Sequence, residues 1–260
     1  MNLNRRAYLK TAFSALGGAV CVPLLSRGRF IQRGESDTSS DMNTLIYENP
    51  FSHPDDVADF ILEGSAHLTF ERQRLRMQNA LPLSAGKRAH FVFWCPEDFP
   101  GQIRVTWDFY PIEEPGLAML FFGAANLEGG SIFDPSLSAR DGQYKQYHSG
   151  ELNTYHISYF RRKQVTERAF HICNLRKSKG FHSVATGADP IPSVVDAQPP
   201  YRMELVKDRG VIRFSINELP VLHWTDDGSS YGPILGGGKI GFRQMAPLVV
   251  EYANFKVYTS

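Results

Sequence analysis

Apolar and polar residues alternate along several short stretches of the chain, most clearly over residues 102–110, QIRVTWDFY. Successive side chains of a β-strand point to opposite faces, so this pattern predicts a strand with one buried face. Its odd-numbered positions are apolar, and its even-numbered positions are polar: Arg104, Thr106, Asp108 and Tyr110. The exposed face would therefore display a guanidinium, a carboxylate and a phenol. Pro111 is expected to end the strand, because proline cannot donate to the ladder.

Further short runs rich in β-branched and aromatic residues, separated by Gly, Pro, Asn and Asp, predict more strands. The predicted strands span residues 66–70, 74–81, 89–95, 117–123, 201–207, 211–217, 221–225, 239–243 and 248–258. One helical turn is expected within residues 49–63, with Pro54 near its start and Ser52 or Asp55 as its cap. Such a series of half-apolar strands, with no long amphipathic helix, predicts an all-β sandwich of two antiparallel sheets.

Residues 143–180 concentrate reactive side chains. The segment holds seven basic residues between Arg161 and Lys179 against a single acid, Glu167. It also contains histidines and tyrosines, each of which needs a hydrogen-bond partner or water: His148, His156, His171, Tyr144, Tyr147, Tyr155 and Tyr159. Because Lys and Arg are usually solvated, a simple exposed loop is the alternative interpretation of the basic residues.

Two strands are predicted on either side of the turn 149–153. The first would place Tyr144, Gln146 and His148 on one face. The second would place His156, Ser158, Phe160 and Arg162 on one face and bury Tyr155, Ile157 and Tyr159. Paired as a hairpin, these strands would bring His148 and His156 close together.

Composition excludes several protein classes. A net charge of +1 over 260 residues argues against a general nucleic-acid-binding protein, which needs a basic face. The cysteines Cys21, Cys95 and Cys173 are too few and too scattered for a disulfide framework or a zinc cluster. Cys95 and Cys173 either pair in an oxidising compartment or remain buried thiols.

The first residues resemble a bacterial twin-arginine export signal. Arg5 and Arg6 precede a weakly apolar run at residues 12–25, which is too short and too rich in Gly and Ala for a membrane span. The residues before Cys21 fit a lipid-attachment site poorly. We therefore expect a periplasmic or secreted protein with no stable membrane span in the mature chain. The expected organisation is an export signal at 1–25, a disordered linker at 26–43 and a folded domain at 44–260.

Two groups of motifs resemble known proteins. The segments YRMELVKDRGVIRFSINELPVLHWTDD and LGGGKIGFRQMAPLVVEYANFKVY are similar to the closing strands of concanavalin A-like lectin/glucanase sandwiches. The motifs QYHSGELNTYHISYFRR and CNLRKSKGFHSVATGADPIP resemble the YesU-like family, a domain of unknown function found among bacterial genes for polysaccharide use. The resemblance covers residues 43–258. It implies a jelly-roll sandwich and a carbohydrate context, and it supplies no catalytic assignment.

The residue types favour β-elimination over glycoside hydrolysis. A retaining glycosidase needs two carboxylates about 5 Å apart, and the sequence has no closely spaced acid pair of that kind. β-Elimination from a uronate needs a cation at the carboxylate and His or Tyr to carry protons. The catalytic candidates are His148, His156, Tyr110 and Arg162. The candidates for substrate binding are Arg104, Asp108, Tyr144, Ser158, Arg161, Asn174, Arg176 and Lys177.

The prediction is therefore an exported lyase or dehydratase that acts on an anionic plant or algal oligosaccharide. A non-catalytic lectin using the same residues is the alternative. A partner-binding protein is a third class. No metal site or cofactor is expected, because His148, His156 and Asp108 do not follow a known ligand spacing. Structural calcium through Asp226 and Asp227 is left open.

Overall fold

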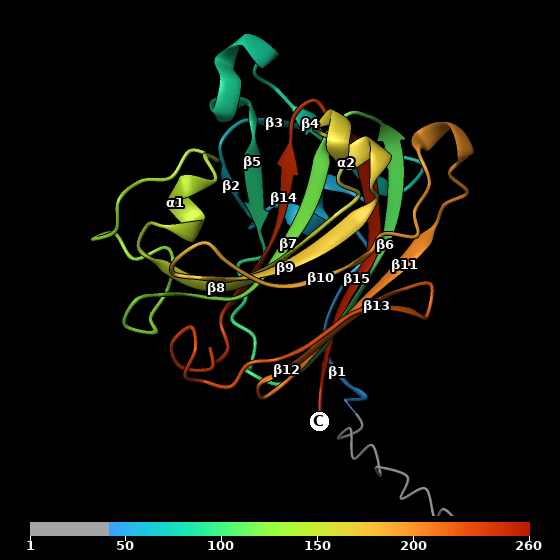
Figure 1. The fold of residues 1–260 in the computed structure, drawn as a ribbon. Helices are drawn as coiled ribbons and strands as arrows, with labels where there is room; N and C mark the ends of the chain where they lie inside the picture. The colour runs from blue at the N-terminus through green and yellow to red at the C-terminus, as the bar shows by residue number, and fades with distance from the viewer. Residues whose placement is uncertain (1–41) are drawn as a thin grey trace, which may run out of the picture. The chain divides into compact units, whose positions relative to one another are not determined.

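Two antiparallel sheets pack face to face in the computed structural model, which describes residues 42–260 (Figure 1). Every strand pair in this part of the chain is antiparallel. The predicted class, an all-β jelly-roll sandwich, is confirmed. The predicted export signal at 1–25 and most of the predicted linker lie outside the described residues.

The first sheet, sheet A, has eight strands. In spatial order they are β13 (Leu219–Thr225), β12 (Val211–Ile216), β11 (Tyr201–Asp208), β6 (Ile103–Glu113), β15 (Val249–Thr259), β4 (Arg74–Asn79) and β3 (Ala66–Glu71), with β1 (Thr44–Asn49) also paired to β15. The C-terminal end of the chain lies beside β1 because β15 and β1 are partners (Figure 1).

The second sheet, sheet B, has seven strands. In spatial order they are β10 (His182–Ala188), β9 (Ile172–Ser178), β8 (Leu152–Tyr159), β7 (Leu117–Asn126), β14 (Lys239–Met245), β5 (Phe91–Trp94) and β2 (Ile61–Glu63). Most of the reactive segment that the sequence singles out belongs to β8, β9 and their connections.

The helical elements are short: α1 (Lys145–His148), α2 (Val165–Ala169), η1 (Pro54–Val57), η2 (Leu83–Ala89) and η3 (Val194–Asp196). The turn predicted within residues 49–63 is η1, and Pro54 is its first residue. The predicted cap is wrong, since His53 caps the turn by accepting from the Asp55 backbone N–H.

Strand β6 runs past the proline that was expected to end it. Strand β11 pairs with β6 only as far as Phe109, so no neighbour on that side requires a hydrogen bond from Pro111. On the other side Pro111 lies opposite Val250, next to a register shift in β15. A proline without an N–H is tolerated at such an edge position.

The inward faces of the two sheets form one apolar core. It includes the residues of β8 that were predicted to be buried, Tyr155, Ile157 and Tyr159. Cys95 and Cys173 are both buried free thiols in this core. Burial raises the pKa of Cys95 to about 11, so this thiol is protonated and unreactive at neutral pH.

A buried ionic network joins sheet B to the loop after β13. Lys177 lies 2.6 Å from the Asp226 carboxylate, and the Tyr155 hydroxyl donates to the same oxygen at 2.5 Å. Lys177 also donates to the carbonyls of Gly232 and Pro233. Lys177 was predicted to bind substrate. Its side chain instead points into the protein and binds this loop through the ion pair and the two hydrogen bonds. The calcium ligands suggested by the sequence are engaged within the chain, since Asp226 binds Lys177 and Asp227 accepts hydrogen bonds from Ser229 and Ser230.

Removing one partner of this network should destabilise the fold strongly. Lys177→Met leaves the buried Asp226 carboxylate without its cation, so we expect the free energy of unfolding to fall by about 3–5 kcal/mol. Urea unfolding followed by circular dichroism measures this loss. The matched variant Lys145→Met removes an exposed lysine of α1 and should change stability by at most about 0.5 kcal/mol. Equal losses in both variants would contradict the structural role of Lys177.

Candidate functional site

Two neighbouring rows of side chains cross the outer face of sheet B. Along each strand, the residue in the second row is two positions away from the residue in the first row. Residues directly opposite each other on paired strands have adjacent side chains. The first row is Gly241, Phe121, His156 and Arg176. The second row is Arg243, Met119, Ser158 and Asn174. The outward orientation predicted for His156 and Ser158 is therefore confirmed, and β9 adds two of the predicted binding residues beside them.

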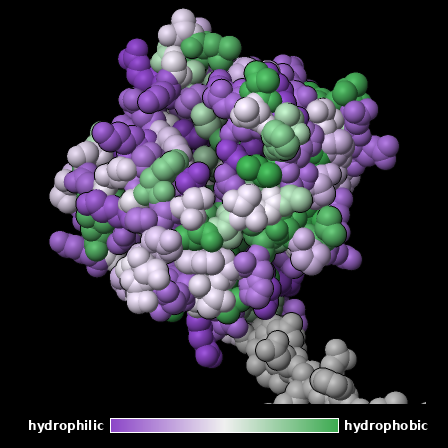
Figure 2. Space-filling view, viewed as in Figure 1, coloured by the Kyte–Doolittle hydropathy of each residue, from purple (hydrophilic) through white to green (hydrophobic). Residues whose placement is uncertain are grey.

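The segment between β7 and β8 covers part of this face. It buries a second apolar cluster outside the main core, in which Tyr147 packs against Trp94 and Phe121. Gly142 is required where the segment turns, because its φ is +89° and a Cβ atom there would lie 2.0 Å from the His90 carbonyl oxygen. In Figure 2 the apolar residues of the visible face form small patches among polar ones.

The predicted strand carrying Tyr144, Gln146 and His148 is wrong, because these residues form helix α1 and the residue that precedes it. Residues at i, i+3 and i+4 share one side of a helical turn, and here Tyr144, Tyr147 and His148 do so. The predicted hairpin does not exist, yet His148 and His156 still come together around the Tyr144 ring. Their ring centroids lie 4.6 and 5.6 Å from that of Tyr144.

The centre of the site is the contact between Tyr144 and His156. The Tyr144 hydroxyl lies 2.6 Å from His156 Nε2, and His156 is fully buried. Burial lowers the pKa of His156 well below its ordinary value, and Arg176, His148 and Arg243 lower it further. Burial raises the pKa of Tyr144 to about 12, against the opposing effect of Arg243, Arg176 and Arg161. At neutral pH the pair is thus an uncharged imidazole and a protonated phenol.

Arg243 lies against the Tyr144 ring and was not singled out from the sequence. Its side chain is 0% exposed, and its guanidinium carbon lies 4.8 Å from the centre of the Tyr144 ring. Nη2 donates to the Gly142 carbonyl, whereas Nε and Nη1 have no hydrogen-bond partner among residues 42–260. Burial lowers the pKa of Arg243 to about 10, so it stays charged at neutral pH. The alternation within residues 239–243 could have revealed it, since Ile240 and Phe242 are core residues.

Two more arginines border the site and are partly exposed. Arg161 donates to the Glu167 carboxylate at 2.6 Å, and the Asn174 amide oxygen, in the orientation that satisfies its contacts, accepts from Arg161 at 2.8 Å. Arg176 lies over the ring of Phe181 at 4.0 Å. We call the whole group the sheet B site: Tyr144, His148, His156, Ser158, Arg161, Asn174, Arg176 and Arg243.

The predicted neutralising residue Arg162 does not belong to this site. Its side chain is fully buried, pairs with Asp189 at 3.2 Å and donates to the Ile191 carbonyl at 2.6 Å. A guanidinium with a buried carboxylate partner and no exposed surface cannot reach a substrate. Arg162 therefore stabilises the loop after β8.

Arg104, Asp108 and Tyr110 lie away from the sheet B site. They occupy the outward positions of β6, which belongs to sheet A. Because the inner faces of the two sheets pack together, these side chains are on the opposite surface of the sandwich. Tyr110 lies under the Arg74 guanidinium at 4.2 Å. Tyr110, a catalytic candidate from the sequence, therefore does not share a surface with His148 and His156.

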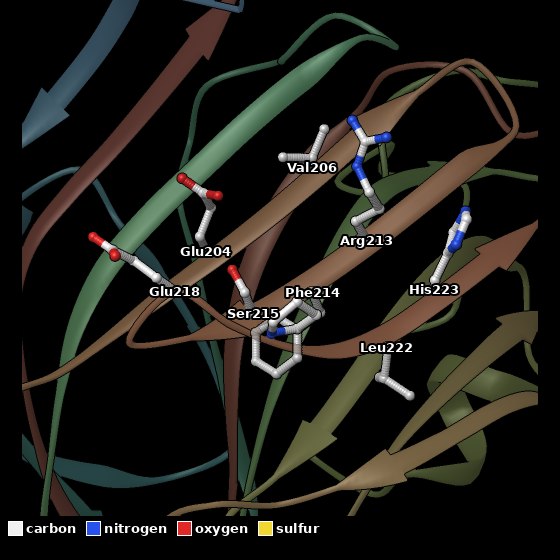
Figure 3. Close-up of a pocket in the computed structure, with 9 residues that line it drawn as sticks. Glu204, Val206, Arg213, Phe214, Ser215, Glu218, Leu222 and His223 are labelled. Carbon is white, nitrogen blue, oxygen red and sulfur yellow. The ribbon is translucent and has the colours of Figure 1, made fainter. Parts of the chain in front are cut away.

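A hollow of about 330 Å³ also opens on sheet A, between β11, β12 and β13 (Figure 3). Glu204 and Glu218 lie at one end of it, and Arg213 and His223 lie at the other (Figure 3). Over residues 42–260, no three His, Cys, Asp or Glu side chains are placed to hold a metal ion together. No helix in the same part of the chain is long and apolar enough to cross a membrane.

The buried His156 should make stability depend on pH. Its folded-state pKa lies below its unfolded-state value of about 6.5, so its contribution is fully present above pH 6.5 and is lost as pH falls below it. We expect His156→Gln to reduce the pH dependence of the unfolding free energy between pH 6.5 and 5 by up to about 1.4 kcal/mol per pH unit. Urea unfolding at several pH values measures it, with His223→Gln, an exposed histidine, as control. An unchanged slope in His156→Gln would contradict the burial of a neutral imidazole.

Comparisons with known proteins show the family and the fold. The model of a family described as "Domain of unknown function (DUF1961)" matches residues 44–257. The "Uncharacterized protein YesU" of Bacillus subtilis (strain 168) is 56% identical over 213 residues, which are 82% of this chain and 94% of the relative. A crystal structure of a Bacillus subtilis protein of unknown function with a galectin-like fold is 55% identical, with a TM-score of 0.80 over 83% of this chain and 96% of that one.

A more distant likeness concerns the fold alone. The carbohydrate recognition domain of Emp46p, in its potassium-bound form, has a TM-score of 0.53 and 11% identity over 82% of this chain and 96% of that one. The family model extends over both sheets, and the Bacillus relative covers 82% of the chain. The chain therefore belongs to the DUF1961 family.

Proposed function

We propose that this protein cleaves oligosaccharides that carry carboxylate groups, by β-elimination at the sheet B site. The observation that carries the proposal is the charge around Tyr144. Three guanidinium groups act on its hydroxyl, those of Arg161, Arg176 and Arg243. The acidic side chain beside these arginines is Glu167, which forms an ion pair with Arg161. Such an excess of buried and half-buried positive charge favours an anionic ligand.

The two partly exposed arginines supply the recognition groups. Arg176 lies next to His156 in the first row, so a carboxylate bound to Arg176 would bring its sugar ring over the Tyr144 hydroxyl. A guanidinium binds a carboxylate through two parallel hydrogen bonds, which fixes the orientation of the ring. Phe181, with 51% of its surface exposed, offers an aromatic face at the edge of the site. The carbohydrate recognition domain that shares this fold is consistent with a saccharide ligand.

His148 is the base in this proposal. Burial, Arg176 and Arg243 lower its pKa, so it is neutral and able to accept a proton at neutral pH. It is half-exposed beside Tyr144, and Nδ1 contacts the Ser149 hydroxyl at 2.6 Å, which leaves Nε2 to face the substrate. His148 removes the proton from the carbon next to the carboxylate. Arg176 stabilises the negative charge that then develops on the carboxylate.

Tyr144 is the acid. Its raised pKa keeps the hydroxyl protonated until the leaving oxygen needs a proton. The C–H bond and the glycosidic C–O bond break, a C=C bond forms, and the phenol proton goes to the departing sugar oxygen. No water or cofactor is consumed. The products are an unsaturated uronate and a shortened saccharide, and the proton on His148 then restores the phenol.

His156 and Arg243 support Tyr144 without touching the substrate. His156 Nδ1 is buried with no partner among the described residues, and an unmatched acceptor costs less than an unmatched N–H donor. We therefore assign the proton to Nε2, which donates to the Tyr144 oxygen. After the hydroxyl proton has left, this N–H and the Arg243 charge stabilise the phenolate. In a cell this chemistry belongs in the periplasm or outside, as the predicted export signal implies.

Removal of the Tyr144 hydroxyl should abolish the reaction while leaving binding intact. With trigalacturonate as substrate, the ultraviolet absorbance of the unsaturated uronate reports the product. We expect Tyr144→Phe to lower kcat by on the order of 10²–10⁴ with little change in KM. The matched control is Tyr110→Phe on sheet A, which should retain wild-type activity. Full activity in Tyr144→Phe would reject the assignment. Binding of trigalacturonate without any new absorbance would favour the alternative, a non-catalytic lectin.

The pH profile should report His148. Because its pKa is lowered, kcat/KM is expected to remain near its plateau at pH 6.5 and to fall only at lower pH, where the base becomes protonated. Measurement of kcat/KM between pH 4 and 8 tests this. His148→Gln should remove the acid limb together with most of the activity. A decline that begins above pH 6.5 would contradict a neutral His148.

A further inference from the structure

A β-bulge interrupts the centre of sheet A, far from the sheet B site. In strand β15 the register against β6 shifts between Ala253 and Lys256. Asn254 adopts a φ of +54°, and its amide Nδ2 donates to Asp108 Oδ2 at 2.7 Å. Bulges redirect a side chain and open a sheet locally. This bulge aims an asparagine at a carboxylate on the neighbouring strand.

A polar hollow of about 280 Å³ opens at the bulge. Its lining includes Thr106, Asp108, Arg202, Asn254, Lys256 and Tyr258. The Asp108 side chain is only 7% exposed, and its second oxygen lies 3.5 Å from Arg202 Nε. A carboxylate has about four lone-pair positions. The two protein contacts leave both oxygens able to accept further hydrogen bonds from a ligand in the hollow.

Each basic side chain around this hollow has an acidic partner, whereas the sheet B site has more arginines than acids. Lys256 pairs with Glu48 at 2.7 Å, Arg104 pairs with Glu204 at 3.4 Å, and Arg202 lies against Asp108. A uronate in this hollow would be repelled by the Asp108 carboxylate, and no surplus of positive charge offsets that repulsion. A neutral ligand with several hydroxyl groups is not repelled. Adjacent hydroxyls can donate to the two Asp108 oxygens, and the Arg202 guanidinium can donate to a hydroxyl or ring oxygen.

We propose that this hollow is a second saccharide-binding site, specific for neutral sugars with adjacent hydroxyl groups and centred on Asp108. The Arg104 guanidinium lies over the Tyr258 ring at 3.9 Å and forms one wall. The hollow of Figure 3 lies on the same face of sheet A. Arg104 on β6 has Val206 of β11, which lines that hollow, opposite it on one side and Tyr258 of β15 opposite it on the other. A longer neutral chain has room to extend there. The protein then holds saccharides on both faces, which raises the local concentration of a branched polysaccharide at the sheet B site.

The test compares neutral and anionic trisaccharides. Galactotriose, mannotriose, cellotriose and trigalacturonate are titrated into the full chain, and binding is followed by NMR or calorimetry. We expect at least one neutral trisaccharide to bind, and Asp108→Asn to weaken that binding by about tenfold or more, because it removes charged acceptors. Tyr144→Phe should bind the same neutral trisaccharide with wild-type affinity, since it lies on the other face. Trigalacturonate should bind Asp108→Asn as it binds the wild type.

A second variant guards against a folding defect. Arg202→Met removes an arginine whose side chain is 68% exposed, so it should leave the unfolding temperature unchanged and still weaken neutral-sugar binding. The proposal is overturned if no neutral trisaccharide binds, or if both variants bind as well as the wild type. It is equally overturned if Tyr144→Phe alone abolishes neutral binding, which would place the sugar on sheet B. Loss of β-elimination with intact neutral binding would leave this second site standing.

Discussion

The burial of a guanidinium charge beneath a tyrosine ring is the constraint on which the sheet B site depends. Arg243 is on β14, a central strand, and has the Gly142 carbonyl and the face of Tyr144 as its main compensation. A buried charge with so few hydrogen bonds is costly. Gly142 can supply its carbonyl only because glycine tolerates the turn beside the His90 backbone. The same turn leads into α1 and sets Tyr144 over His156, so one arginine connects the sheet to the covering segment and to the Tyr144–His156 pair.

The two outer faces of the sandwich differ in how their charges are balanced. On sheet B the arginines outnumber the acids and surround a phenol and imidazoles with shifted pKa values. On sheet A each base around the Asp108 hollow has an acid beside it. In our two proposals these surfaces receive an anionic ligand and a neutral ligand respectively. This division follows from the sandwich itself, because each sheet has a single outer face and its strands all contribute to it.

Local pattern was enough to predict most strands. Period-two alternation identified β6, β8 and β12 and the inward residues of β8, because the two faces of a strand differ in burial, and runs rich in β-branched and aromatic residues identified β11 and β15. The motif resemblance added the jelly roll. The error at Tyr144–His148 has a simple origin, since residues four apart share a face in both a strand and a helix. Tyr147 distinguishes the two: it is fully buried against Trp94 beside Tyr144, as only a helical turn allows.

By itself the sequence determined the inward and outward residues of β6 and of β8 as far as Ser158, because that choice depends on neighbours along the chain; Phe160, predicted to point outward, lies in the main core. It also determined the polar chemistry of the chain, with many basic, imidazole and phenol groups and few paired acids. Only the tertiary structure decided which outward residues share a surface. Alternation says that Asp108 and His156 both leave the core, but their strands belong to different sheets. The same holds for Arg162 and Arg243, whose burial comes from segments distant in sequence that no local pattern includes.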